Sequence, residues 1–105
     1  METNMEKLNK FNLYVGLNDK DLKYQTVPTE QAKNIVNNIC GDCSIQEITG
    51  YYTHENGEKV KENTLKVELL FKEFEDVKLY VTDLKRLLNQ ESIAVSQEVT
   101  MSALM

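Results

Sequence analysis

The chain has 105 residues, 41% of them hydrophobic and 28% charged, which is typical of a single globular domain that needs no disulfide or metal to fold. The formal net charge is −5 and the lysines are dispersed, which argues against binding to a nucleic-acid backbone. No apolar run approaches the roughly 20 residues of a membrane helix, and the N-terminus lacks a signal-peptide pattern, so we expect no membrane association and a cytoplasmic location.

The first third of the chain predicts a strand followed by a helix. Residues 1–9 are polar, and we expect a disordered extension ahead of a single domain at residues 10–105. Residues 11–17 alternate between apolar and polar side chains, as a half-buried strand does. Residues 30–40 carry an apolar stripe at helical spacing, with Thr29 as the expected N-cap and Gly41 as the expected helix end.

A β-hairpin is predicted around the Asn56-Gly57 pair, because both positions of this dipeptide tolerate positive φ. A two-residue turn there places Glu47 opposite Lys66 on the face away from the helices, and turns Ile48 toward the core. The alternation is poor near Gly50, which predicts a bulge.

The last third predicts a helix at residues 73–89 and a strand at residues 92–100. Acidic residues begin the helix, basic residues end it, and Asn89 suits a left-handed position after it. Ile93, Val95 and Val99 are expected on one face of the strand. The resulting order β-α-β-β-α-β predicts an α+β, ferredoxin-like fold, a four-stranded antiparallel sheet with two helices on one face.

Both cysteines lie near the end of the first predicted helix. Cys40 falls on the apolar stripe, where the helix dipole and Asp42 disfavour a thiolate. A structural zinc ion needs about four ligands, and beyond Cys40 and Cys43 the sequence offers only His54, which we interpret as an exposed turn residue. We therefore expect two free thiols, no metal and no cofactor.

The sheet face away from the helices is expected to be polar. Tyr14 is the only aromatic residue expected there on the central strands, and carboxylates surround it, which argues against the stacking of RNA bases. Two or three carboxylates on one face suit acid–base chemistry or a divalent ion, whereas a solvated surface is the simpler explanation. The residues expected on this face are Tyr14, Glu47, Lys66, Glu68 and Glu98.

Three segments carry short motifs: YVGL in the first strand, the hairpin segment with the spacing G-x-aromatic-x4-G-x4-E, and NQESIAV before the last strand. Together they resemble an uncharacterised bacterial family of small ferredoxin-like proteins over roughly residues 11–100. The resemblance implies the same fold and a cytosolic branch of the kind found on conjugative transposons or phage-like elements, but no reaction. By position it singles out Tyr14, Gly16, Gly50, Tyr52, Gly57, Glu62, Gln90, Glu91 and Ser92.

Two interpretations of function remain. The leading one is a non-enzymatic binding or assembly module, an accessory protein of a mobile element. The alternative is a small enzyme with a pocket at the sheet face or a subunit interface, with Glu68 or Glu91 as the base and Tyr14 or Tyr52 as the proton donor. The candidate binding residues are Tyr14, Gln90, Glu91 and Ser92, and we expect the last three to bond loop backbone.

The final residues, MSALM, are apolar and follow directly on a strand expected at a sheet edge. Open edges invite pairing with another chain, and Met101, Ala103 and Met105 or Leu104 are expected beyond the helix layer. We therefore expect a homodimer, the commonest closed assembly. The alternative is a monomer whose tail folds back over its own helices.

Overall fold

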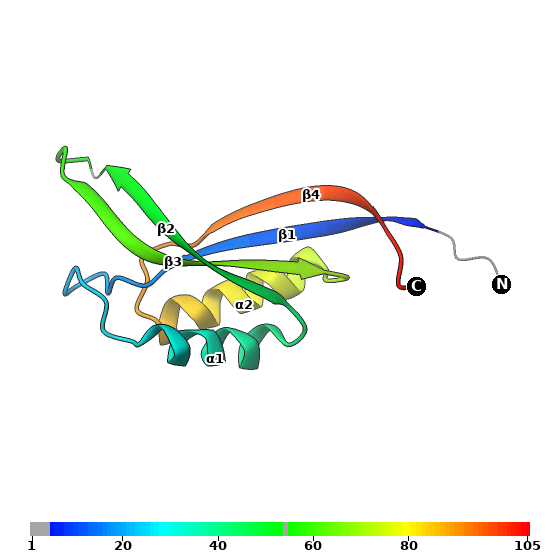
Figure 1. Ribbon diagram of the computed structural model, residues 1–105, viewed down its shortest axis with the longest axis horizontal. Helices are drawn as coiled ribbons and strands as arrows, with labels where there is room; N and C mark the ends of the chain where they lie inside the picture. The colour runs from blue at the N-terminus through cyan, green and yellow to red at the C-terminus, as the bar shows by residue number, and fades with distance from the viewer. Residues whose placement is uncertain (1–4, 54) are drawn as a thin grey trace.

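The computed structural model describes residues 5–53 and 55–105. The elements follow in the order β1 (Glu6–Gly16), α1 (Thr29–Cys40), β2 (Ser44–Thr53), β3 (Lys59–Leu70), α2 (Phe74–Leu87) and β4 (Ala94–Ser102). The strands form one antiparallel sheet in the order β2-β3-β1-β4, and both helices cover the same face (Figure 1). The predicted ferredoxin-like α+β fold is therefore confirmed.

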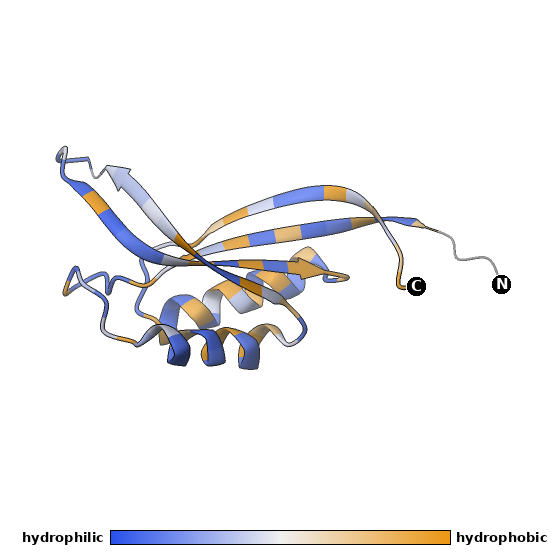
Figure 2. Cartoon of the chain, viewed as in Figure 1, coloured by the Kyte–Doolittle hydropathy of each residue, from blue (hydrophilic) through white to orange (hydrophobic). Residues whose placement is uncertain are grey.

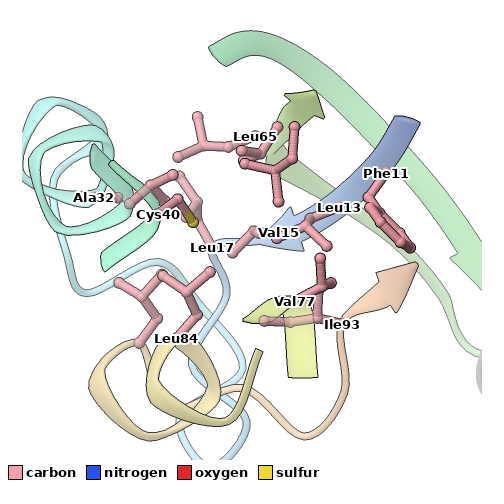
Figure 3. Packing of buried hydrophobic residues seen from close by; sticks show 14 residues of the cluster. Phe11, Leu13, Val15, Leu17, Ala32, Cys40, Leu65, Val77, Leu84 and Ile93 are labelled. Atoms are coloured by element: carbon pink, nitrogen blue, oxygen red, sulfur yellow. The ribbon is translucent and has the colours of Figure 1, made fainter. Parts of the chain in front are cut away.

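The hydrophobic core lies between the helices and the two central strands (Figure 3). Every second residue of β1 and β3 points toward the helices, which gives the alternation of hydrophobic and hydrophilic colour along these strands (Figure 2). Burial of this apolar surface, at about 25 cal/mol per Å², is the main stabilising contribution to the fold. The largest fully buried side chains include Phe11, Leu13, Leu65, Leu69, Leu84 and Val36.

The first strand is longer than predicted. Residues 6–9, which we expected to be disordered, pair with β4, so that Glu6 lies opposite Ser102 and Asn9 opposite Val99. This part of the sheet extends past the helices (Figure 1), so neither of its faces is buried in the core and its sequence shows no apolar alternation. Residues 1–4 lie outside the described residues.

The same extension carries the exposed apolar end of the chain. Val99 and Met101 lie on the helix side of β4 but are 67% and 55% exposed, because no helix reaches them. Leu104 and Met105 are also exposed, as predicted for this end, whereas Ala103 is half-buried. Val95 lies on the same side, and Ile93 is buried just before the strand.

The β2–β3 hairpin differs from the prediction by one residue in register. Thr53 pairs with Lys59, so the connection is the five-residue loop 54–58 rather than a two-residue turn. Within this loop Gly57 has φ of 84°, and the side-chain oxygen of Asn56 accepts the Glu58 N–H at 2.9 Å. His54, interpreted above as a turn residue, lies outside the described residues.

A shift of one residue moves every side chain of a strand to the opposite face. Glu47 therefore lies opposite Leu65 on the helix side, where its carboxylate pairs with Lys33 of α1 at 3.2 Å, rather than with Lys66 on the open face. Ile48 moves in the other direction, to a position opposite Thr64 on the open face.

Two local predictions in this half of the chain are wrong. Pairing between β2 and β3 is continuous through Gly50, so there is no bulge at that residue. Thr29 is the first residue of α1 rather than its N-cap, and its hydroxyl accepts a hydrogen bond from the Gln25 side chain at 3.1 Å. Gly41, with φ of 68°, ends the helix as predicted.

Candidate functional site

A broad, open hollow of about 1120 Å³ lies on the sheet face away from the helices. Its floor is formed by β1, β2 and β3, and its rim by the loop after β1, the β2–β3 hairpin and the turn before β4. All the residues singled out by the family resemblance line this hollow except Gly57. Segments that are far apart in the sequence therefore converge on one place.

Two glycines keep the floor of the hollow open. Gly16 lies opposite Thr64 and Gly50 lies opposite Glu62, so that one glycine flanks β3 on each side. A Cβ atom at residue 16 would lie 2.5 Å from the carboxyl carbon of Glu62, and a Cβ at residue 50 would lie 2.8 Å from the Thr64 hydroxyl. Neither glycine has a positive φ, so what opposes a side chain at these positions is lack of space, and at residue 16 the Glu62 carboxylate has to move to provide it.

Glu62 is the half-buried carboxylate between these glycines. One of its oxygens, Oε2, accepts the backbone N–H of Asn18 at 3.0 Å. Within residues 5–53 and 55–105, no lysine or arginine lies within ion-pair distance of this carboxylate, although four lysines line the hollow. Glu62 is therefore a carboxylate held by a backbone N–H, without an ion pair to any of the described lysines or arginines.

Tyr52 is the tyrosine that contacts Glu62. Partial burial, the charge of Glu62 and a hydrogen bond to that carboxylate all raise the pKa of the Tyr52 hydroxyl. The hydroxyl therefore stays protonated and donates a hydrogen bond to the Glu62 carboxylate. Tyr14, half-buried on β1 opposite Ala94, is a second aromatic side chain along the hollow.

Gln90 is a structural part of the wall. It is 8% exposed, and its Nε2 group donates to the backbone oxygens of Asn18 at 2.7 Å and Leu88 at 3.2 Å. The predicted bonding to loop backbone is confirmed for this residue. Glu91 and Ser92, which follow it, are exposed at the rim.

The turn before β4 is tied to the loop after β1. Asn89 has φ of 48°, as predicted, and its side-chain amide donates to the carboxylates of Asp19 and Asp21 at 2.9 Å each. The bond from Asn89 is the largest cause that lowers the pKa of Asp19. The backbone N–H of Lys20 also donates to the Asn89 oxygen at 3.0 Å. These bonds hold two sides of the rim together.

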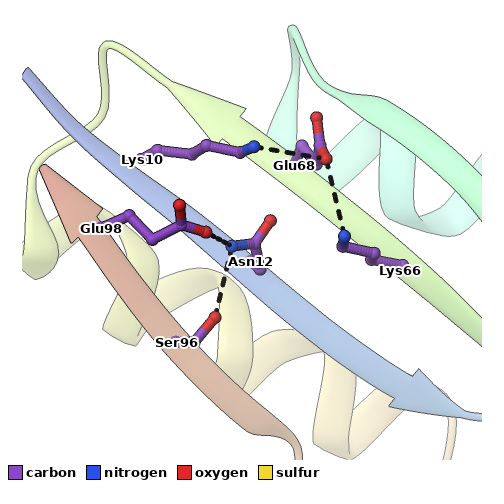
Figure 4. A network of polar contacts seen from close by, with 6 residues as sticks. All are labelled: Lys10, Asn12, Lys66, Glu68, Ser96 and Glu98. Carbon is purple, nitrogen blue, oxygen red and sulfur yellow. Dashed lines mark hydrogen bonds and ion pairs between the residues drawn. The ribbon is translucent and has the colours of Figure 1, made fainter. Parts of the chain in front are cut away.

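Glu68, considered above as a base, lies outside the hollow. It forms ion pairs with Lys10 at 3.5 Å and Lys66 at 3.8 Å on a separate part of the open face (Figure 4). Beside it the buried Asn12 donates to Glu98 at 3.0 Å and to Ser96 at 3.3 Å. Lys10, Lys66 and Glu68 thus form a small network of ion pairs on the surface, next to the hydrogen bonds of Asn12.

The cysteines lie on the other side of the sheet. Cys40 is buried, Cys43 is half-buried, and both are free thiols. Burial is the main cause that raises the pKa of both thiols, that of Cys40 to about 12. Within residues 5–53 and 55–105, no three histidine, cysteine or acidic side chains gather as metal ligands would. None of the described helices is long and apolar enough to span a membrane.

The fold and the hollow together define a small ferredoxin-like α+β protein with a candidate ligand site on the open face of its sheet. No protein-family model matches the chain, and no curated protein sequence matches it.

Solved structures of similar fold include a phage SAM lyase in complex with S-methyl-5′-thioadenosine, at 22% identity and a TM-score of 0.66. That match covers 99% of this chain and 95% of the lyase chain. A phage SAM lyase in the apo state matches at 21% identity and a TM-score of 0.62, over 94% and 86% of the two chains. CutA from Synechococcus elongatus PCC7942 matches at 11% identity and a TM-score of 0.59, over 93% and 80%. At these identities the similarity establishes the fold.

Proposed function

We propose that this chain is an enzyme that binds S-adenosylmethionine in the open-face hollow and cleaves it as a lyase, with release of S-methyl-5′-thioadenosine. The observation that carries the proposal is Glu62, a half-buried carboxylate with no ion-pair partner among the described residues, between two glycines and beside a tyrosine. The proposal develops the enzyme alternative reached from the sequence. It is supported by the similarity in fold, over nearly the whole chain, to a phage SAM lyase.

The chemistry of S-adenosylmethionine suits this hollow. The molecule carries a positive sulfonium and a positive α-ammonium group, and a partly buried carboxylate with no cation beside it attracts such charges. Tyrosine rings near the carboxylate offer electron-rich faces to a cation. The side chains of Tyr14 and Ile48 provide apolar surface for the adenine ring. The volume of about 1120 Å³ leaves room for a ligand of this size.

The proposed reaction needs no second substrate. The carboxylate oxygen of the substrate attacks Cγ of its own aminobutyryl chain, a C–O bond forms, and the Cγ–S bond breaks. The electron pair of that bond goes to sulfur, which becomes the neutral thioether of S-methyl-5′-thioadenosine, and the other product is homoserine lactone. Because one positive and one negative charge disappear, removal of water from the reacting groups favours the reaction. We assign to Glu62 the binding of the α-ammonium group, which orients the chain for ring closure.

The test is product formation from S-adenosylmethionine, followed by chromatography of S-methyl-5′-thioadenosine and homoserine lactone against a protein-free blank. The Glu62→Gln variant keeps the shape of the side chain and removes its charge. We expect its catalytic efficiency to fall about 10- to 100-fold, the value of one hydrogen bond to a charged group. Glu68→Gln is the matched control, because Glu68 lies on the same face outside the hollow.

Binding separates the enzyme from a binding module. S-adenosylhomocysteine lacks the sulfonium charge, so calorimetry should show weaker binding of this compound than of S-adenosylmethionine. Binding that depends on Glu62 without any release of product would favour the non-enzymatic module. If the wild-type chain neither binds nor cleaves S-adenosylmethionine, the proposed function is wrong. The mobile-element origin, the homodimer and the cytoplasmic location stay predictions.

A further inference from the structure

Gln90 is held in place by the end of α2. After the last helical residue, Asn89 adopts a left-handed conformation, and the backbone N–H of Gln90 bonds back to the Lys85 oxygen at 2.9 Å. The C-cap of α2 is Leu88, and a bond from the second residue after the C-cap back into the last helical turn is typical of a Schellman motif. The backbone of Gln90 is therefore anchored to a helix, a rigid element, rather than to a free loop.

The side chain of Gln90 reaches from this anchor to the end of β1. Its Nε2 group bonds to the backbone oxygen of Asn18, a residue 72 positions earlier in the chain. Its second bond goes to the Leu88 oxygen. Because Gln90 is 8% exposed and its amide hydrogens have these two acceptors, the amide group is not free to donate to a ligand.

Asn18 is bonded on both sides. Its oxygen accepts from Gln90 at 2.7 Å, and its N–H donates to Glu62 Oε2 at 3.0 Å. Beside its bond with Tyr52, the Glu62 carboxylate is therefore positioned by one backbone N–H, and the Gln90 side chain is one of the groups that hold the backbone there. Gly16, whose missing Cβ leaves room for the carboxylate, makes this arrangement sterically possible.

We propose that Gln90 is a positioning residue of the hollow, which acts on the ligand only through Asn18 and Glu62. Its predicted effect on S-adenosylmethionine rests on the proposed function. Its effect on the geometry of Glu62 does not. Small displacements of a group that orients a substrate are costly, and about 1 Å can reduce a rate 100-fold.

The test compares Gln90→Met with Gln97→Met. Methionine has nearly the length of glutamine but no amide, so Gln90→Met removes both bonds without shortening the side chain. Gln97 lies on β4 and donates to Asn9 at 2.9 Å, away from the hollow, so the same substitution there is a matched control. We expect Gln90→Met to lower the catalytic efficiency about tenfold, and Gln97→Met to leave it unchanged.

Two readouts distinguish positioning from a loss of general stability. The first is the preference for S-adenosylmethionine over S-methyl-5′-thioadenosine, which lacks the α-ammonium group that we assign to Glu62. A general loss of stability weakens binding of both compounds equally, whereas a misplaced Glu62 reduces the preference toward that of Glu62→Gln. The second is the NMR resonance of the Asn18 amide, which senses the charge of the carboxylate that it contacts. Its response to acid should disappear in Glu62→Gln and shrink strongly in Gln90→Met.

The outcomes are separable. Loss of the acid response and of the charge preference in Gln90→Met supports the inference, and retention of both overturns it. If wild-type protein neither binds nor cleaves S-adenosylmethionine, the proposed function fails on its own. The Asn18 resonance then tests the positioning role of Gln90 by itself. A full acid response of this resonance in Gln90→Met overturns the role, and loss of the response supports it.

Discussion

Replacement of Gly16 by alanine tests the geometry on which the candidate site depends. The new methyl group would lie 2.5 Å from the carboxyl carbon of Glu62 and 2.7 Å from its Oε2 atom, closer than carbon and oxygen atoms approach in proteins. The backbone at residue 16 is not in the left-handed region, so alanine fits the main chain. We therefore expect the carboxylate to leave the floor of the hollow while the sheet stays intact.

The magnitude follows from the bonds that Glu62 makes. A displaced carboxylate loses the Asn18 N–H at 3.0 Å, and a hydrogen bond to a charged group contributes about 1.5–3 kcal/mol. Water replaces part of it because the side chain is half-exposed, so the lower end applies. Alanine in place of glycine stabilises by about 0.4–1 kcal/mol through the unfolded state. The net loss is about 1 kcal/mol, or roughly 4–8 °C in melting temperature.

The assay is a double-mutant cycle of urea unfolding with Gly16→Ala, Glu62→Ala, both substitutions and neither. In the Glu62→Ala background the obstructing carboxylate is absent, so Gly16→Ala should be neutral or slightly stabilising. If Gly16→Ala destabilises by the same amount in both backgrounds, the methyl group does not collide with Glu62 and the reasoning is wrong. Affinity for S-adenosylmethionine should fall with Gly16→Ala much more than stability does.

Three further predictions concern stability and assembly. Burial raises the pKa of Cys40 from 9.0 to about 12, so between these pH values the folded thiol keeps its proton while the unfolded thiol loses it. The contribution of Cys40 to the free energy of unfolding is therefore complete below about pH 9 and is lost toward pH 12. Urea titrations should show this decline, and Cys40→Ala should reduce it. Gly57→Val places a β-branched residue at φ of 84° and should cost about 1–2 kcal/mol; an unchanged melting temperature would contradict this. Light scattering should find a dimer for the full chain and a weaker one for a chain that ends at Ser102, whereas a monomeric full chain at high micromolar concentration would refute the dimer.

The fold was predictable because its two central strands and its two helices each turn one face to the hydrophobic core. The buried side chains can be recognised from apolar residues that alternate along the strands and recur at helical spacing in the helices. The strand alternation covers residues 11–17 and 65–69. The register of the hairpin was not predictable in the same way. Asn56-Gly57 predicts a two-residue turn, but the strands are joined by a longer connection, in whose exposed residues 55–58 the Glu58 N–H bonds to the Asn56 side chain. None of residues 55–58 is buried, so no core contact of these residues opposes the longer connection.

This register error explains what was missed in the site. The predicted register places Glu47 on the open face with Glu68 and Glu98, and it gives Glu62 no role. The position of Glu62 in the family motif and the glycines at 16 and 50 were signals that could have indicated it, because a glycine inside a strand often marks a close approach of another group. The convergence of Gln90 on Asn18 required the three-dimensional path of the chain.

The strand order also determines when the hollow can form during folding. The β2–β3 hairpin joins neighbouring segments, whereas β1 pairs with β4 from Glu6 opposite Ser102 to Tyr14 opposite Ala94. Contacts that close such long loops form slowly. During synthesis β1 leaves the ribosome first and must wait, with both edges unpaired, for β3 on one side and finally β4 on the other. Gln90 follows α2 in the chain, so the Gln90–Asn18 bond can close only after α2 has been synthesised, and a nascent chain can have its hairpin well before the hollow is complete.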